Sequence, residues 1–196
     1  MKLCVFQGTF NPIHRAHLQV ADYVSKNYDF DKILFIPAFK PPHKDYDPKM
    51  SFHRFNMVKL AAQGKLNFDV SDIEFRSDNK SYTYNTIREL YKIYDIEGKI
   101  NFIIGTDAFE KIESWYETDK LKKLVHFIVF RRTNDFTKGN YDYLKQKGYD
   151  FSFAELDFCD ISSTQLRSRI ANGEKINDIV TSEVEDYIKE NGLYKN

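Results

Sequence analysis

Two histidines three residues apart, His14 and His17, follow a glycine turn close to the start of the chain. The turn comes directly after a short apolar run, Leu3 to Phe6, so the pattern predicts a strand that leads through the turn into a helix. A glycine lets the backbone approach a ligand closely, and a helix start offers free N–H groups and a positive dipole end. The imidazoles add donors that can become cationic. This stretch therefore predicts a phosphate-binding site.

The same histidine pair has two other interpretations, a zinc site or two polar residues satisfied by the backbone near a helix start. Zinc requires three or four converging ligands. The other histidines, His43, His53 and His126, and the cysteines, Cys4 and Cys159, show no spacing that would supply them. We therefore expect no metal site built on the pair, and we expect Cys4 to be a small buried residue of the first strand.

A second candidate anion site lies near the other end of the chain, at residues 161–167. Ser162 and Gln165 stand three apart, the spacing of a capping box, so a helix should begin here. The segment places hydroxyl and N–H groups at a helix start with Arg167 one turn further in, although a plain capping box with a surface arginine would look the same.

Further polar groups follow other apolar runs. Gly105 and Asp107 end one such run, and a glycine at a strand end beside a carboxylate is a position for holding a ribose hydroxyl; a helix cap is the alternative. The longest irregular segment, Pro37 to Pro48, holds four of the five prolines. Long loops inside compact domains are often functional lids, and the alternative is an exposed loop with solvated lysines.

These residues must be positioned by a regular framework, and the apolar pattern indicates which one. Strands are predicted at residues 2–7, 32–37, 68–75, 100–105, 125–130 and 151–156. Helices are predicted at 15–27, 51–63 and 83–95, with the second burying Phe52, Phe55, Val58 and Ala62, and the third capped by Thr83. Continuous apolar strands that alternate with amphipathic helices are typical of the α/β class, here a Rossmann-like doubly wound parallel sheet with helices on both faces. In such folds ligands lie beyond the carboxyl ends of the strands.

The end of the chain predicts a small helical C-terminal part. After the helix at Ser162, a second capping box from Ser182 to Glu185 should open a last helix that stops near Gly192. No linker or repeat interrupts the sequence, so we expect residues 1–196 to form a single domain.

Composition restricts the partners. The chain has 29 basic and 29 acidic side chains and a formal net charge of zero, which argues against broad binding to nucleic acid or to an anionic membrane. The first apolar run ends at Gln7, too early for a signal peptide, and no stretch reaches membrane-spanning length. The cytoplasm is the expected location.

Both end motifs resemble those of the nucleotidyltransferase superfamily, whose members transfer a nucleotidyl group from ATP or CTP and release pyrophosphate. Gly8 to His17 is similar to its G-x-F-x-P-x-H-x-x-H signature, with Ala16 where glycine is usual. Residues 161–167 are similar to its I-S-S-T-x-[IVL]-R motif, which is intact here.

Three inner segments resemble one family in particular, the nicotinate mononucleotide adenylyltransferases. Residues 37–44 match its P-x-x-x-P-P-H-K loop, residues 81–86 its S-Y-T-x-D-T segment, and residues 105–107 with Trp115 its G-[AT]-D and tryptophan. Asn85 stands where aspartate is usual, and Arg132 replaces the proline that often follows the equivalent of Arg131.

The resemblance implies adenylyl transfer from ATP to nicotinate mononucleotide, giving deamido-NAD and pyrophosphate. It implies that the triphosphate and the leaving pyrophosphate are neutralised by His14, His17, Lys44 and Arg167. The implied ATP-binding residues also include Gly8, Thr9, Phe10, Gly105, Asp107, Ile161, Ser162, Ser163 and Thr164. The implied mononucleotide-binding residues are Thr83, Trp115, Arg131 and Lys44. Mg²⁺ is expected, bound mainly through the phosphates of ATP.

Other functions stay open on the sequence alone. The acceptor could be nicotinamide mononucleotide or phosphopantetheine, although the phosphopantetheine enzyme usually has threonine at the position of His14. A non-catalytic nucleotide sensor of the same fold is a second alternative. A fragment of an aminoacyl-tRNA synthetase is a third, but no basic surface or appended RNA-binding domain supports it. The oligomeric state is open.

Overall fold

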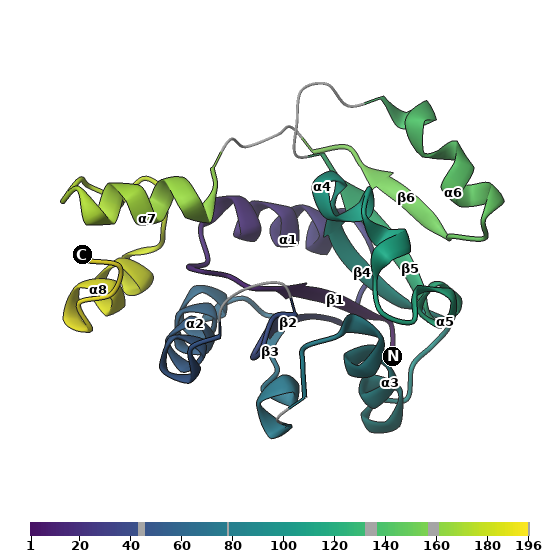
Figure 1. The fold of residues 1–196 in the computed structure, drawn as a ribbon, viewed down its shortest axis with the longest axis horizontal. Helices are drawn as coiled ribbons and strands as arrows, with labels where there is room; N and C mark the ends of the chain where they lie inside the picture. The colour runs from purple at the N-terminus through teal and green to yellow at the C-terminus, as the bar shows by residue number, and fades with distance from the viewer. Residues whose placement is uncertain (43–45, 78, 132–136, 157–160, 196) are drawn as a thin grey trace.

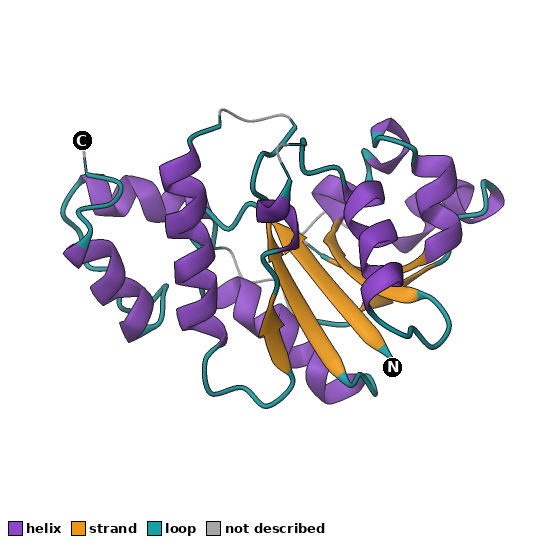
Figure 2. Ribbon diagram, turned by 90° about the horizontal axis from the view of Figure 1, so that it is seen from below, coloured by secondary structure: helices purple, strands orange, loops and turns teal. Residues whose placement is uncertain are grey.

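In the computed structural model, which describes residues 1–42, 46–77, 79–131, 137–156 and 161–195, six strands form one sheet in the order β3-β2-β1-β4-β5-β6 (Figures 1 and 2). The strands are β1 (Leu3–Gly8), β2 (Lys32–Pro37), β3 (Phe68–Val70), β4 (Ile100–Gly105), β5 (Val125–Phe130) and β6 (Phe151–Ala154). All neighbouring strands pair in parallel, and Val5 of β1 lies between Leu34 of β2 and Phe102 of β4. This order confirms the doubly wound α/β class.

The chain starts in the middle of the sheet, builds outward to β3, and then crosses back to begin the other half at β4. The carboxyl ends of β1 and β4 are therefore neighbours from which the chain departs in opposite directions. In open parallel sheets the crevice at such a switch point is where ligands bind. Gly8 ends β1 and Gly105 ends β4, so the predicted nucleotide residues lie on the two sides of this crevice.

The sheet separates two apolar cores, because successive side chains of a strand point to opposite faces. One core joins Cys4 and Phe6 to α1 (Arg15–Asn27), α2 (Pro48–Ala62), α7 (Ser163–Ala171) and α8 (Ser182–Glu190). The other joins Leu3 and Val5 to α3 (Thr83–Ile93), α4 (Thr106–Phe109), α5 (Thr118–Leu124) and α6 (Asp142–Gln146). Figure 1 shows α7 and α8 at the opposite end of the molecule from α5 and α6. None of the described helices is both long and apolar enough to cross a membrane.

The predicted strand at 68–75 is too long, since β3 ends at Val70. The chain turns there because the Ser71 hydroxyl accepts the Ile73 N–H at 3.2 Å and the Asp72 carbonyl accepts the Phe75 N–H at 2.8 Å. A serine hydroxyl that binds a backbone N–H two residues on is one way in which this residue type favours turns over strands. The result is a short 3-10 helix, η1 (Ile73–Arg76); two others are η2 (Ile112–Ser114) and η3 (Lys138–Tyr141).

The expected apolar face of the second helix is also partly wrong. α2 begins earlier than predicted, at Pro48, because the Asp47 side chain caps it by accepting the Lys49 N–H at 2.9 Å. Phe52 is 56% exposed, whereas Ser51 and Arg54 are buried. The helix is rotated so that these two polar side chains, rather than Phe52, face inward.

Two predicted caps are displaced by one residue. Tyr82, in an extended conformation, is the N-cap of α3, so Thr83 is the first helical residue and not the cap. At α8 the cap is Thr181, whose hydroxyl accepts the Val184 N–H at 3.4 Å, and Ser182 is already helical. The last helix ends at Glu190, close to the predicted stop.

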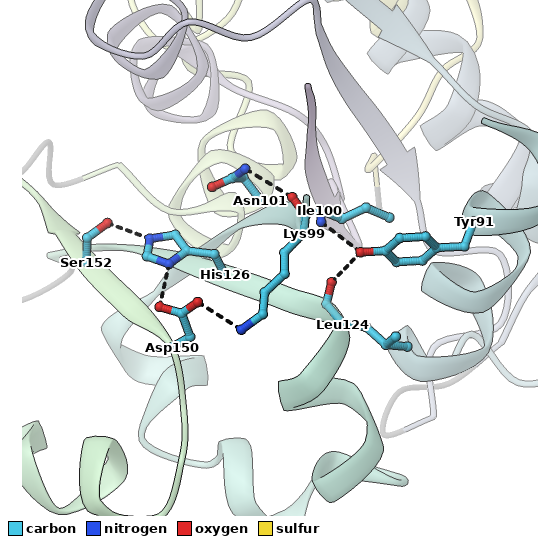
Figure 3. Close-up of polar contacts among 8 residues, drawn as sticks. All are labelled: Tyr91, Lys99, Ile100, Asn101, Leu124, His126, Asp150 and Ser152. Atoms are coloured by element: carbon cyan, nitrogen blue, oxygen red, sulfur yellow. Dashed lines mark hydrogen bonds and ion pairs between the residues drawn. The ribbon is translucent and has the colours of Figure 1, made fainter. Parts of the chain in front are cut away.

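A polar network joins the strand starts at the amino end of the sheet, opposite the crevice (Figure 3). His126 Nδ1 lies 2.9 Å from Asp150 Oδ1, and His126 Nε2 lies 2.9 Å from Ser152 Oγ. Lys99 Nζ donates to the other Asp150 oxygen at 2.9 Å. Partial burial alone would raise the pKa of Asp150, but the hydrogen bonds from Lys99 and His126 outweigh it and hold that pKa below its ordinary value.

Candidate active site

The turn between β1 and α1 is shaped by the ring of Phe10. A Cβ on Gly8 would lie 3.0 Å from that ring, tighter than most side-chain contacts, so a larger residue would require the Phe10 ring to shift. Phe10 itself has a φ of 47°, a left-handed conformation that is rare and strained for a bulky residue. Its ring is 3% exposed and packs edge-on against His17, with 5.1 Å between ring centroids. Burial of the ring thus offsets the strain that shapes the turn.

The two histidines lie together at the start of α1. His14 is the N-cap and is 3% exposed, and its ring stacks on that of His17 with 3.7 Å between centroids. The His14 backbone N–H donates to His17 Nδ1 at 3.3 Å. The proton of the neutral His17 ring is therefore assigned to Nε2, which can donate to a ligand. A donor imidazole at a helix start is well suited to an anion.

The same turn is held by donors from distant parts of the chain. Arg54 Nη1 of α2 donates to the Thr9 carbonyl at 2.6 Å, and Arg167 Nη1 of α7 donates to the Asn11 carbonyl at 2.8 Å. The Ser163 hydroxyl donates to the Pro12 carbonyl at 3.0 Å. The motifs predicted from the two ends of the sequence therefore meet at one place.

The predicted capping box at the start of α7 is confirmed. Ser162 Oγ accepts the Gln165 N–H at 3.2 Å, and Gln165 Oε1 accepts the Ser162 N–H at 2.9 Å. Arg167 also donates to Thr164 Oγ1 at 3.3 Å, which orients its guanidinium. Ile161, directly before this segment, is half-buried and packs against the first core.

The ends of β4 and β5 contribute the next group of predicted residues. Gly105 is the N-cap of α4, Thr106 is buried, and Asp107 is exposed in the first turn. Gly105 pairs with Phe130, so Arg131 follows directly beside this helix start. Arg131 Nε is buried and meets no hydrogen-bond partner among the residues that the structure describes.

A pair of stacked tyrosines brings the predicted mononucleotide residues together. Tyr82, which precedes Thr83, stacks on Tyr116, which follows Trp115, with 4.6 Å between ring centroids. Trp115 is half-buried and packs edge-on against Phe102 of β4 at 6.2 Å. The indole is thus part of the second core and keeps an accessible portion, which leaves room for its predicted contact with a ligand.

The loop after β2 carries predicted residues that lie partly outside the described ranges. Lys44 and His43 fall in residues 43–45, which are not described. Lys40 is described: its N–H donates to Ser81 Oγ at 2.9 Å, and its carbonyl accepts the Ser81 N–H at 3.0 Å. Its ammonium lies 4.9 Å from the ring centroid of Tyr46. The base of this loop is therefore fastened to the segment that precedes α3.

Arg54 is a residue of the site that the sequence reasoning missed. It is 3% exposed and donates to the Thr9 carbonyl, the Phe39 carbonyl at 3.4 Å and the Ser51 hydroxyl at 2.8 Å. Burial lowers the pKa of its guanidinium, but arginine stays charged because its ordinary pKa is so high. The sequence does contain a sign of this role. Arg54 lies on the same helix face as Met57, Val58 and Ala61, so it is a cation within an apolar stripe.

Tyr194 is a second missed residue. Its hydroxyl donates to Asn11 Oδ1 at 2.7 Å, so the last turn of the described chain packs on the first motif. Burial raises the pKa of this phenol, which keeps it a neutral donor. No local pattern in the sequence marks this contact, because the two residues are 183 positions apart.

The described residues contain no group of three histidine, cysteine, aspartate or glutamate side chains arranged to hold a metal ion. Mg²⁺ binds oxygen ligands and is commonly carried by substrate phosphates with few protein carboxylates. The donors around the turn are imidazole, guanidinium and hydroxyl groups. This donor set fits an ion that arrives on the phosphates and does not fit a resident magnesium cage.

Comparisons with known proteins show what this chain is similar to. A family model described as cytidylyltransferase-like matches residues 5–169. The chain is 37% identical to a probable nicotinate-nucleotide adenylyltransferase of Caldicellulosiruptor bescii over 100% of both chains. It is 35% identical to one of Fusobacterium nucleatum, over 96% of this chain and 97% of the other. The fold is similar to that of Plasmodium falciparum nicotinic acid mononucleotide adenylyltransferase complexed with NaAD, with a TM-score of 0.81, 22% identity, and coverage of 98% and 97%.

Proposed function

The chain belongs to the cytidylyltransferase-like family, and we propose that it acts there as a nicotinate-nucleotide adenylyltransferase in NAD biosynthesis. It transfers the adenylyl group of ATP to nicotinate mononucleotide, and the products are deamido-NAD and pyrophosphate. The observation that carries this proposal is the meeting of two anion-binding segments, the His14–His17 turn and the Arg167 helix, beside the sheet's switch point.

The reaction requires positioning and charge stabilisation more than proton transfer. The phosphate of the mononucleotide attacks the α-phosphorus of ATP, a new P–O bond forms, and the bond to the pyrophosphate oxygen breaks. A phosphate monoester is already anionic near neutral pH, so no general base is needed. Catalysis then depends on in-line alignment and on cations around the phosphoryl oxygens.

The site residues divide into a donor side and an acceptor side. On the donor side, His14, His17 and Arg167, with Lys44 from the loop, neutralise the triphosphate and the leaving group. The other ATP-binding residues are Gly8, Thr9, Phe10, Gly105, Asp107, Ile161, Ser162, Ser163 and Thr164. On the acceptor side, Thr83 and Trp115 bind the pyridine ring, and Arg131, whose Nε is buried at the end of β5, binds the mononucleotide phosphate with Lys44.

Two further features belong to this proposal. Mg²⁺, bound through the ATP phosphates, would supply additional neutralisation of the triphosphate. Residues 1–196 act as one nucleotidyltransferase domain, because α8 packs on α2 and shares its core with β1. ATP and nicotinate mononucleotide are the partners, and the cytoplasm is the place of action.

The test measures pyrophosphate release with ATP and Mg²⁺ while nicotinate mononucleotide, nicotinamide mononucleotide or phosphopantetheine is offered in parallel. We expect strong preference for the acid, with deamido-NAD identified by mass. Arg167→Ala should lower kcat/KM by at least about 10²-fold. Arg169→Ala is the matched control on the same helix, because Arg169 donates to Asp178 at 3.0 Å and not to the turn.

Two results would contradict the proposal. Preference for another acceptor would leave the proposed ATP-binding residues in place but contradict nicotinate mononucleotide as the acceptor substrate. ATP binding without turnover on any acceptor would indicate a nucleotide sensor.

A further inference from the structure

A buried glutamate lies between the loops that carry the two halves of the site. Glu74 belongs to η1 and is 7% exposed. Burial raises the pKa of its carboxyl, while the hydrogen bonds that it accepts oppose that rise. A buried acid is costly unless its oxygens are fully hydrogen-bonded, so its presence calls for an explanation. The chemistry proposed above does not use it.

The partners of Glu74 are all donors, and they come from different segments. Gln7 Nε2, at the end of β1, and Thr86 Oγ1, in α3, donate to one carboxyl oxygen, the latter at 2.7 Å. The Phe39 backbone N–H, in the loop after β2, donates to the other oxygen at 3.2 Å. The Ser81 hydroxyl also forms a hydrogen bond with this carboxyl. Glu74 therefore contacts three segments at once: the end of β1, the loop between Pro37 and Pro48, which the proposed function assigns to the triphosphate (the triphosphate loop), and the segment around Thr83.

The Phe39 peptide is held from both sides. Its N–H donates to Glu74, and its carbonyl accepts the Ser51 hydroxyl at 2.8 Å and Arg54 Nη2 at 3.4 Å. Arg54 in turn holds the Thr9 carbonyl in the phosphate turn. A buried carboxyl group and a buried guanidinium thus hold the base of the loop that continues to Lys40.

We propose that Glu74 is a positioning residue for the transfer, which fixes the triphosphate loop relative to the acceptor segment at Thr83. This inference rests on the proposed function. In-line attack requires the two substrates to be aligned closely, and a displacement of about 1 Å can cost on the order of 10²-fold in rate. Loss of Glu74 should therefore act mainly on kcat, because each substrate still meets its own contacts while their mutual alignment is relaxed.

The first variant is Glu74→Leu, which keeps the size of the side chain and leaves the Phe39 N–H without an acceptor. We expect kcat to fall roughly ten- to hundredfold, with smaller changes in the KM for ATP and for nicotinate mononucleotide. Leu144→Ala is the control for stability, because Leu144 is fully buried in α6 among residues of the second core. It should lower the thermal midpoint and leave kcat unchanged.

The second variant is Glu74→Gln, which retains an oxygen for the Phe39 N–H. The Thr86 hydroxyl and the Gln7 amide can each reverse from donor to acceptor, so the amide can be accommodated. We expect most of the lost kcat to return. Thr86→Val removes one hydrogen-bond partner of Glu74 with little change of shape, and we expect it to lower kcat modestly. Combined with Glu74→Gln, the two substitutions should lower kcat by less than the product of their separate effects. Thr86→Val also tests the inference if Glu74→Leu fails to fold.

The outcomes separate this inference from the proposed function. Wild-type protein that makes no deamido-NAD would overturn the function and the positioning role with it. Active wild type with unchanged kcat in folded Glu74→Leu and Thr86→Val would overturn the inference alone. A Glu74→Gln variant as slow as Glu74→Leu would also overturn the inference. So would a Leu144→Ala variant that has the same thermal midpoint as Glu74→Leu and loses as much kcat.

Discussion

At the scale of single residues, one backbone hydrogen bond determines which atom of His17 can act on a ligand. The His14 N–H occupies Nδ1, which leaves Nε2 as the protonated nitrogen of the neutral ring. The stacked imidazole of His14 lies close enough that two cationic rings would repel each other. The negative charge of a bound triphosphate would offset that repulsion, so the pair suits a highly charged anion.

His17→Ala tests this arrangement. Because the imidazole is placed to stabilise charge that develops on the leaving phosphate, we expect kcat to fall by roughly 10²–10³ with the fold retained. His17→Gln keeps an N–H close to the position of Nε2 and should recover part of the rate. His53→Ala is the control, since His53 Nδ1 lies 3.0 Å from the hydroxyl of Tyr187 in α8. Near wild-type turnover of folded His17→Ala in steady-state kinetics would contradict the role of His17 in stabilising the leaving phosphate.

At the scale of elements, two helix starts have similar caps and different surroundings. Ser162 caps α7, whose first turn donates through Ser163 to the Pro12 carbonyl in the turn between β1 and α1. Thr181 caps α8, whose first turn forms no hydrogen bond with that turn among the described residues. Comparing the Ser162 and Thr181 caps therefore separates the contribution of a cap to stability from its contribution to ligand binding.

We expect Ser162→Ala and Thr181→Ala each to lower the free energy of unfolding by about 1 kcal/mol, measured in urea. Only Ser162→Ala should also raise the KM for ATP, up to about fivefold, which is the factor that corresponds to about 1 kcal/mol. Equal KM values in the two variants would show that the start of α7 does not bind the nucleotide.

Much of the framework was predictable because strands and helices have different apolar periods. The runs at β1, β2, β4 and β5 and the helix α1 were predicted at or within one residue of their observed bounds. The errors arise where local hydrogen bonds or a buried polar side chain compete with the period. The Ser71 hydroxyl and the Asp72 backbone carbonyl accept N–H groups that end β3, and Arg54 turns inward to reach the Thr9 and Phe39 carbonyls.

The candidate site was partly predictable for a topological reason. Parallel strands present their carboxyl ends at one edge, so motifs that follow strands gather there whatever their distance in sequence. Arg54 and Glu74 were missed because the contacts that link them to the turn at Thr9 and to the loop at Phe39 span 45 and 35 positions and follow no local pattern. Contacts of this kind follow from the tertiary fold and not from any local sequence pattern.

At the scale of the whole molecule, the two ends of the sheet have separate tasks. The carboxyl end carries the histidine turn, Arg167 and Arg131, whereas the amino end carries the network of Lys99, His126 and Asp150 (Figure 3). The network pairs strand starts with one another, and its hydrogen bonds among the described residues reach none of the predicted site residues. We therefore expect it to affect stability and not turnover.

Asp150→Asn should lower the free energy of unfolding by roughly 0.2–1 kcal/mol near neutral pH and leave kcat unchanged. The folded-state pKa of Asp150 lies below its ordinary value of 3.8, so the carboxylate contributes stability above that value. The contribution is lost as the pH falls through the lowered pKa. Urea unfolding of both proteins across this range should show their difference shrinking below about pH 4, and a constant difference would contradict the assignment.

The separation of the two cores by the sheet bears on how such a chain can diverge over generations. Phe10 and Leu166, which support the donor side, belong to one core, and Ile87 and Trp115, which support the acceptor side, belong to the other. Substitutions that reshape the proposed acceptor side therefore need compensation within the second core, which α3, α4, α5 and α6 share with one face of the sheet. A lineage could exchange one acceptor for another while its apparatus for ATP is inherited unchanged.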